Sequence, residues 1–277
     1  MPNLNTKKIG GLFRGLFVGD PGTGKTIAAG SFPGPMKIYD FDDRVDPLLS
    51  FYPLRNDIEY VTVVSQDSER KDCINFMEFC KEFMDLQDRC PYETVIIDSI
   101  TQMSNCCVLY SLFINGEFNL KKGKLPRPQF EEYKAETATT LRILEVVKSL
   151  PAHFIATAHP ISKLEVTVPG DLESLRPILS LTGYGTKTPS MIPIGFNEMY
   201  HFYNQTVNQP GQAPKRFIST VATGEMPSKT ALPLPPTIEL TNKKLYNVIQ
   251  AYLAEHNVKL ETARAKASVQ KAEVQTT

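Results

Sequence analysis

The chain alternates short apolar runs with longer segments in which apolar residues recur at every third or fourth position. The short runs are rich in β-branched and aromatic residues, which predicts strands. The predicted strands lie at residues 12–18, 36–41, 59–64, 94–98 and 153–158. Helices are predicted at residues 25–31, 69–87, 101–113 and 129–149. Because strands alternate with helices, we expect an α/β fold with a mostly parallel central sheet flanked by helices.

The pattern changes after residue 159. Residues 160–195 carry many Pro, Gly, Ser and Thr, which predicts a long loop. Two further strands, which fit an antiparallel edge, and a last helix are expected at residues 198–203, 216–221 and 240–254. From residue 258 the sequence is polar with few large apolar groups. We therefore expect one domain over residues 1–257 and a flexible C-terminal tail over residues 258–277.

Composition narrows the functional classes. The 277 residues are enough for one large α/β domain, and the 42% hydrophobic content allows a real core. The 30 basic residues equal the 30 acidic ones, so any site for a polyanion must be local. Five cysteines without a CxxC pair predict neither a disulfide framework nor a zinc site, and they fit a reducing, cytoplasmic setting. Without a signal-peptide core or a spanning apolar run, we expect no membrane contact.

The strongest motif is GDPGTGKT at residues 19–26, which satisfies the phosphate-loop pattern G-x-x-x-x-G-K-[ST]. Glycines let the backbone wrap so that its N–H groups point at phosphates, and the following helix adds its positive end. Lys25 would neutralise phosphate oxygens, and the Thr26 hydroxyl would hold Mg²⁺. A chance Gly-rich turn is the alternative, and by itself the motif fits ATP or GTP. The candidate nucleotide ligands are Gly19, Asp20, Pro21, Gly22, Thr23, Gly24, Lys25, Thr26 and Ile27.

Acidic residues end two of the predicted strands. Asp98 closes the apolar run TVIID, where P-loop proteins carry a second Mg²⁺ carboxylate; its alternative role is to cap the next helix. Many AAA+ ATPases carry a water-activating Glu directly after this Asp, but here Ser99 follows. Asp40 and Asp42, at the end of another strand, are then the best candidates to orient the attacking water, unless they only form a turn.

His159 follows the apolar run HFIATA. A polar side chain at the carboxyl end of that strand can touch the γ-phosphate and report its loss to the adjoining loop. The alternative is a solvated histidine at the start of a loop.

In their order, GDPGTGKT, MKIYDFD, TVIIDS and FIATAHP resemble the core motifs of RecA-like recombinase-type ATPases. They resemble more closely the phage and prophage ATP-binding proteins of the AAA-domain type, some of which act as single-strand annealing proteins. The resemblance covers residues 10–255 and implies a RecA-like P-loop ATPase that uses ATP and Mg²⁺. It matches Asp98 to the Mg²⁺ carboxylate, Asp42 to the water-activating Glu and His159 to the polar sensor, which is usually Gln.

The resemblance also implies two DNA-lining loops, at residues 114–128 and 160–195. Basic groups beside an aromatic residue suit single-stranded DNA through backbone charge and base stacking, whereas a solvated loop is the alternative. The candidate DNA ligands are Lys121, Lys122, Lys124, Arg127, Lys163, Arg176 and Lys187. Related ATPases often complete their site with a basic residue from a neighbouring subunit. Arg216 and Lys229 are candidates for this trans-acting role, and an ordinary surface charge is the alternative.

These inferences lead to one main hypothesis, an ATPase of phage DNA recombination or replication that assembles as a homo-oligomer on single-stranded DNA in the host cytoplasm. An ATP-dependent interaction or loader module without DNA affinity is a second hypothesis, and salt-dependent mobility shifts would separate the two. A small-molecule kinase ranks lower, because the sequence shows no Arg-rich lid segment.

Overall fold

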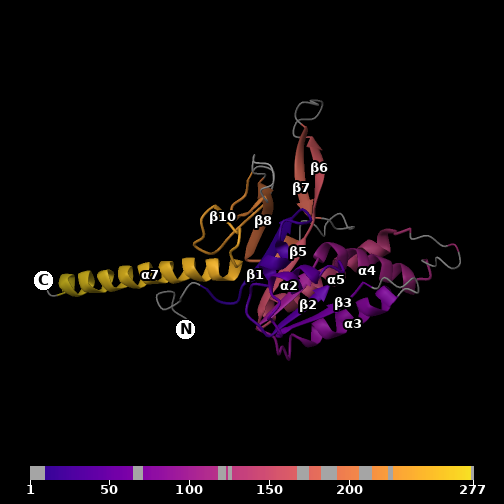
Figure 1. Cartoon of the computed structure of the whole chain (residues 1–277), viewed down its shortest axis with the longest axis horizontal. Coiled ribbons are helices and arrows are strands. Elements are labelled where there is room, and N and C mark those ends of the chain that lie inside the picture. Colours follow the sequence, from indigo (N-terminus) through magenta and orange to yellow (C-terminus); the bar gives the residue numbers. More distant parts are fainter. Residues whose placement is uncertain are drawn as a thin grey trace.

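The structure is a computed structural model, and it describes residues 10–64, 71–117, 123, 127–166, 175–181, 192–205, 214–223 and 227–275. A central sheet crosses the molecule in the strand order β10-β9-β8-β1-β5-β4-β2-β3 (Figure 1). Its strands are β1 (Arg14–Gly19), β2 (Met36–Asp40), β3 (Ile58–Thr62), β4 (Thr94–Asp98), β5 (His153–Ala158), β8 (Glu198–Gln205), β9 (Lys215–Ser219) and β10 (Thr237–Glu239).

Neighbouring strands from β8 to β3 pair in parallel, whereas β9 and β10 join one edge in antiparallel pairs. This arrangement confirms the predicted α/β class with a mostly parallel central sheet, including the antiparallel edge. Because β5 lies between β1 and β4, the carboxyl ends of these three strands lie next to one another at one edge of the sheet. Ligands of open α/β sheets bind at such an edge.

Helices cover both faces of the sheet (Figure 1). α3 (Lys71–Asp85), α4 (Ile100–Ile114) and α5 (Phe130–Ser149) form one apolar cluster with the sheet; α1 (Lys25–Ala29), α2 (Asp46–Phe51) and the start of α7 (Leu245–Gln275) form another on the opposite face. Strand residues alternate between the two clusters. In β4, Val95 and Ile97 join the first cluster and Ile96 joins the second. Burial on both faces explains why these strands read as continuous apolar runs.

The expected long loop at residues 160–195 contains a hairpin. β6 (Pro160–Val166) pairs with β7 (Leu175–Leu181) in antiparallel register and forms a small separate sheet beside the central one (Figure 1). The 3-10 turn η4 (Ile192–Gly195) ends the segment. The loop prediction was wrong for the two strands, because the Pro, Gly and Ser content of the whole segment outweighed the apolar residues within PISKLEV and LRPILSL.

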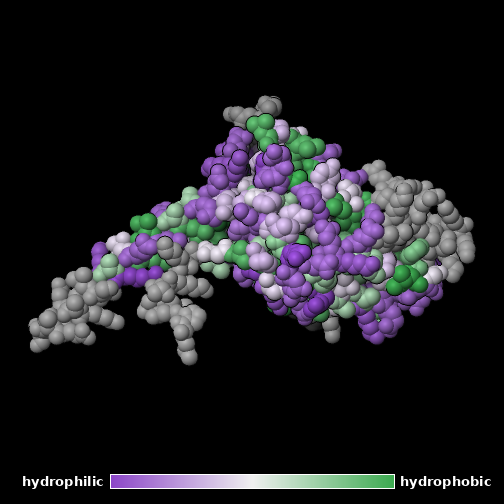
Figure 2. All heavy atoms as spheres, turned by 90° about the horizontal axis from the view of Figure 1, so that it is seen from below, coloured by the Kyte–Doolittle hydropathy of each residue, from purple (hydrophilic) through white to green (hydrophobic). Residues whose placement is uncertain are grey.

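The expected flexible tail is also corrected, since α7 continues as a helix to Gln275. Residues 258–275 contain many Ala, Lys, Glu and Gln and neither Gly nor Pro, so helix propensity sustains a segment that composition alone assigned to disorder. The helix extends away from the sheet as an arm (Figure 1), and hydrophobic side chains follow this arm in Figure 2. None of the described helices combines the length and the apolar character that a bilayer crossing requires.

Candidate nucleotide-binding site

The predicted phosphate loop connects β1 to α1 at the carboxyl edge of the sheet. Gly22 and Gly24 have φ angles of 80° and 92°, in the left-handed region where a side chain would be strained. A side chain at Gly19 is excluded for another reason, because its Cβ would lie 2.3 Å from the carbonyl oxygen of Phe202. These glycines therefore allow a tight turn that no other residue type would adopt without strain.

Lys25 begins α1 and lies almost completely buried over the loop. Its Nζ donates hydrogen bonds to the carbonyl oxygens of Gly19, at 2.7 Å, and Asp20, at 2.9 Å. Burial lowers the pKa of Lys25 to about 8, and the charges of Asp98, Asp42 and Asp20 partly oppose this shift. The ammonium group thus lies in a poorly hydrated place, where an additional anionic partner would stabilise its charge.

Asp98 ends β4 and is hydrogen-bonded through both carboxylate oxygens. The Thr26 hydroxyl donates to one oxygen at 2.6 Å, and the Thr157 hydroxyl from β5 donates to the other. Burial raises the pKa of Asp98, and the two hydroxyl donors oppose that rise. The helix-capping alternative belongs to its neighbour, because the Ser99 side chain accepts from the Gln102 backbone N–H at the start of α4.

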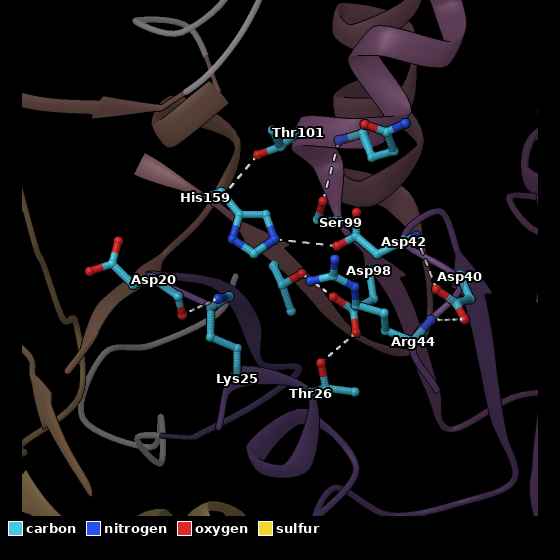
Figure 3. A network of polar contacts seen from close by, with 12 residues as sticks. Asp20, Lys25, Thr26, Asp40, Asp42, Arg44, Asp98, Ser99, Thr101 and His159 are labelled. Carbon is cyan, nitrogen blue, oxygen red and sulfur yellow. Dashed lines mark hydrogen bonds and ion pairs between the residues drawn. The ribbon is translucent and has the colours of Figure 1, made fainter. Parts of the chain in front are cut away.

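Asp42 and His159 come from different strand ends and meet at the same edge (Figure 3). The His159 Nε2 lies 3.3 Å from Asp42 Oδ2, and the His159 backbone N–H donates to the Thr101 hydroxyl at 2.9 Å. Burial would raise the pKa of Asp42, but the hydrogen bond and charge of His159, together with a hydrogen bond from Ser99, lower it overall. Asp42 is therefore held as a carboxylate between two polar neighbours.

Asp40 has a different environment from Asp42. Its two carboxylate oxygens accept the backbone N–H groups of Asp42, at 3.1 Å, and Arg44, at 2.9 Å (Figure 3). Burial raises the pKa of Asp40 to about 6, and the charge of Asp98 adds to the shift. The structure thus gives Asp40 the turn-forming role: it shapes the segment that presents Asp42 and does not line the cavity described next.

A cavity of about 300 Å³ brings the candidate residues together. Its walls are Pro21, Gly22, Gly24, Lys25, Thr26, Ile27, Asp42, Arg44, Pro47, Phe51, Asp98, His159 and Arg216. Sequence reasoning missed Arg44, Phe51 and the support of Thr157. A polar Thr157 inside the buried run HFIATA was a usable signal, whereas Phe51 lies on α2, a six-residue helix that was not predicted from the sequence.

The structure places the two candidate trans-acting residues differently. Arg216, on β9, lines the cavity of its own chain. Lys229 lies away from the cavity, where its Nζ donates to the Pro193 carbonyl oxygen at 2.8 Å and its backbone pairs with Met199. Among the DNA candidates, Arg127 is exposed just before α5. The others, Lys121, Lys122, Lys124 and Lys187 and the side chains of Lys163 and Arg176, lie outside the described residues.

A parallel sheet with a phosphate loop, a buried carboxylate bonded to the loop threonine and a second acidic residue at the same edge defines a P-loop nucleotide-binding protein. A family model described as an AAA domain matches residues 13–230, so the chain belongs to this AAA-domain family. Together with the sheet order, this makes it a P-loop ATPase domain of the RecA-like type.

Comparison with curated proteins finds no match. Among solved structures, a KaiC-like protein from Pyrococcus horikoshii is 15% identical with a TM-score of 0.41, and the match covers 87% of this chain and 96% of that one. The flagellar accessory protein FlaH from Methanocaldococcus jannaschii is 11% identical with a TM-score of 0.39, over 83% of this chain and 87% of that one. Similarity this distant carries no argument about the chemistry of the site.

Proposed function

We propose that the protein is a Mg²⁺-dependent ATPase whose catalytic carboxylate is Asp42. One observation carries the proposal. The cavity of about 300 Å³ is lined by Lys25 of the phosphate loop, the Thr26–Asp98 pair and the Asp42–His159 pair. A cation for phosphates, oxygen ligands for a metal and an ionised carboxylate are the parts that phosphoryl transfer to water requires.

The residues present fit a Mg²⁺ ion. The Thr26 hydroxyl and the Asp98 carboxylate are hard oxygen donors 2.6 Å apart, the kind of ligand that Mg²⁺ prefers beside nucleotide phosphates. No cluster of three or more His, Cys, Asp or Glu is placed to hold a metal among the described residues, so the nucleotide itself would complete the coordination. When bound, the ion would neutralise charge on the phosphate oxygens. Thr157 holds Asp98 in position for this role.

Asp42 supplies the carboxylate that would orient the attacking water. Its lowered pKa keeps it ionised at neutral pH, which a base or a water-positioning group needs. His159 contacts Asp42 and directly precedes β6, so a change at the γ-phosphate can be passed from His159 to the hairpin. His159 therefore connects Asp42, which would position the water, to the hairpin outside the nucleotide site.

The decisive experiment is equilibrium binding of ATP to wild type and to Lys25→Ala. We expect the variant to lose most ATP affinity, because it removes the buried charge that faces the phosphates. Lys259→Ala is a matched control, since Lys259 is an exposed lysine on α7 paired with Glu255. Full ATP affinity in Lys25→Ala with an intact fold would reject the phosphate-loop assignment.

We further propose single-stranded DNA as the partner and a homo-oligomer as the working state, in a pathway of DNA recombination or replication. The support is the motif resemblance and the position of the second candidate loop, because β6 begins next to His159; the first candidate loop follows the far end of α4, a helix that begins next to Ser99. ATP hydrolysis should rise when single-stranded DNA is added, and particle size should grow with ATP. If no binding to single strands occurs even at low salt, the loader or interaction module without DNA contact becomes the better function.

A further inference from the structure

Arg216 reaches the phosphate loop through the order of strands within one chain. β8 pairs directly with β1, which leads into the loop, and β9 pairs with β8. Arg216 on β9 lies opposite Asn204 on β8. Asn204 Nδ2 donates to the Gly22 carbonyl oxygen at 3.4 Å, so both members of this cross-strand pair lie beside the loop of their own chain.

The Arg216 side chain lies between the loop and α2. A Cβ at Gly24 would come 3.2 Å from Arg216 Cδ and 3.5 Å from its Nε, so the side chain crosses directly over the loop backbone. On its other side the guanidinium carbon lies 5.5 Å from the centroid of the Phe51 ring. An aromatic face attracts a guanidinium and holds it in a preferred orientation.

The guanidinium group is available to a ligand. Within the described part of the chain, its N–H groups make no hydrogen bond, and no carboxylate lies at ion-pair distance; the backbone N–H, by contrast, donates to the Thr241 hydroxyl. By comparison, Arg14 and Arg55 use their guanidinium groups on backbone carbonyls or on Asp57. Arg216 thus lines the cavity with guanidinium N–H donors that no described residue accepts.

We infer that Arg216 is a phosphate ligand of the nucleotide bound in its own chain, and that Phe51 is the positioning residue that holds its guanidinium over the phosphate loop. This inference rests on the proposed ATP site and reverses the expected trans-acting role of Arg216. A planar fork of donors matches phosphate oxygens and stays charged at all physiological pH values. The site would then hold Lys25 and Arg216 as charged phosphate ligands of one chain before any subunit assembly.

ATP affinity is the first test. Because a hydrogen bond to a charged group is involved, Arg216→Ala should weaken ATP binding by about 10- to 100-fold, and Arg216→Lys should recover only part of it. Lys215→Ala is the matched control, since this neighbouring cation lies 3.7 Å from Glu239 and outside the cavity. If Arg216→Ala binds ATP as wild type does, while Lys25→Ala does not, the inference fails and the ATP site stands.

A double-mutant cycle tests the role of Phe51. Phe51→Ala should weaken ATP binding in the wild-type chain and have little further effect in the Arg216→Ala chain, because its role acts through Arg216. If Phe51 instead contacts the base directly, its loss weakens binding equally in both chains, and the positioning role is wrong. Comparable unfolding curves for the four proteins would show that the effects are not losses of folding.

A mixing experiment decides between action within a chain and action across subunits. Lys25→Ala retains Arg216, and Arg216→Ala retains its phosphate loop. If Arg216 acts in its own chain, an equimolar mixture should hydrolyse ATP no faster than the sum of the two variants measured alone. If activity appears on mixing, an Arg216 side chain is completing the neighbour's site, and the inference is overturned.

Discussion

At the residue scale, Asp98, the proposed metal ligand, and Asp42, the proposed water-activating group, have different surroundings. Asp98 is occupied by hydroxyl donors from Thr26 and Thr157, and burial raises its pKa while those donors stabilise its charged form. Asp42 is held by different groups, the side chains of His159 and Ser99. The two carboxylates therefore have separate supports, and changing one should leave the other in place.

Replacing Asp42 tests this separation. Asp42→Asn should lower the rate of ATP hydrolysis by about 100-fold or more, because the amide cannot accept a proton or orient water as a carboxylate does. ATP affinity should change by less than about tenfold, since Lys25, Thr26 and Asp98 are untouched. Steady-state hydrolysis and equilibrium binding measure the two quantities.

The matched control for this substitution is Asp43→Asn. Asp43 is the exposed neighbour with a φ angle of 52°, a conformation that asparagine also adopts readily. It should hydrolyse ATP at the wild-type rate. An Asp42→Asn protein that keeps the wild-type rate would show that another group activates the water.

Linear spacing was enough to predict the phosphate loop and the position of Asp98, because each lies next to a strand that the apolar pattern reveals. Thr157 stands out as a polar residue in an apolar run, but the groups that Thr157 and Arg216 approach were not predictable from the sequence. Their approach to the site depends on β5 lying between β1 and β4, and on β9 pairing with β8. Strand order of this kind is a property of the folded sheet, and no local pattern records it.

At the element scale, His153 connects the starts of two neighbouring strands. The Phe13 backbone N–H donates to His153 Nδ1 at 2.9 Å, next to the pairing of β1 with β5. Burial lowers the pKa of His153, with the charge of Arg14 adding to the shift and that of Glu93 opposing it. The neutral imidazole is therefore part of the junction, because protonation would remove the acceptor for Phe13.

This junction predicts a pH dependence of stability. Because the pKa of His153 is lower in the folded protein, the unfolded chain binds the proton more readily. The stabilisation is complete above the ordinary histidine pKa of about 6.5 and is lost as pH falls through the folded pKa. The free energy of unfolding in urea should decrease over this window in wild type and decrease less in His153→Gln. Equal decreases in both proteins would show that the junction does not titrate.

The helices and strands were predicted well where the apolar periodicity is strong, as in α3 and β4. They were predicted poorly where this periodicity is weak. α2 was missed because six residues give too short a pattern, and the β6–β7 hairpin because its turn-forming composition dominated. Both segments adjoin the site: α2 supplies Phe51, and β6 follows His159.

At the scale of the whole molecule, α7 combines a packed start with a projecting end (Figure 1). Ile249 is buried in the core cluster beneath the sheet, whereas Val258 is 64% exposed only a few turns further along the helix. The fold should therefore depend on the first part of α7 and tolerate change beyond it.

Two substitutions in this helix test the division. Ile249→Ala should lower the free energy of unfolding by about 2–5 kcal/mol, because it leaves a cavity in the core. Val258→Ala serves as the control and should change it by less than about 0.5 kcal/mol. Urea unfolding followed by circular dichroism measures both. Equal effects of the two substitutions would contradict the packing of α7 against the sheet.

Ligand binding should also be visible in global stability. A ligand that binds only the folded state adds about 2.7 kcal/mol to the free energy of unfolding at a hundredfold excess over its Kd. MgATP should therefore raise the melting temperature of the wild-type protein by several degrees, and removal of Mg²⁺ with a chelator should reduce the gain. Lys25→Ala should melt at the same temperature with and without MgATP, and a shift in this variant would contradict the assigned site.

Ser99 has a consequence for how this enzyme can change over evolution. In ATPases that carry a catalytic Glu directly after the Mg²⁺ carboxylate, this Glu stands at the start of a helix and must also activate the attacking water. Here Ser99 caps α4 and supports Asp42 through a hydrogen bond, while the proposed catalytic carboxylate itself lies on the segment after β2. A lineage could thus change its turnover through substitutions near Asp42, in a turn already shaped by Asp40, without altering α4. The rate of ATP hydrolysis and the structure of α4 could then change independently during evolution.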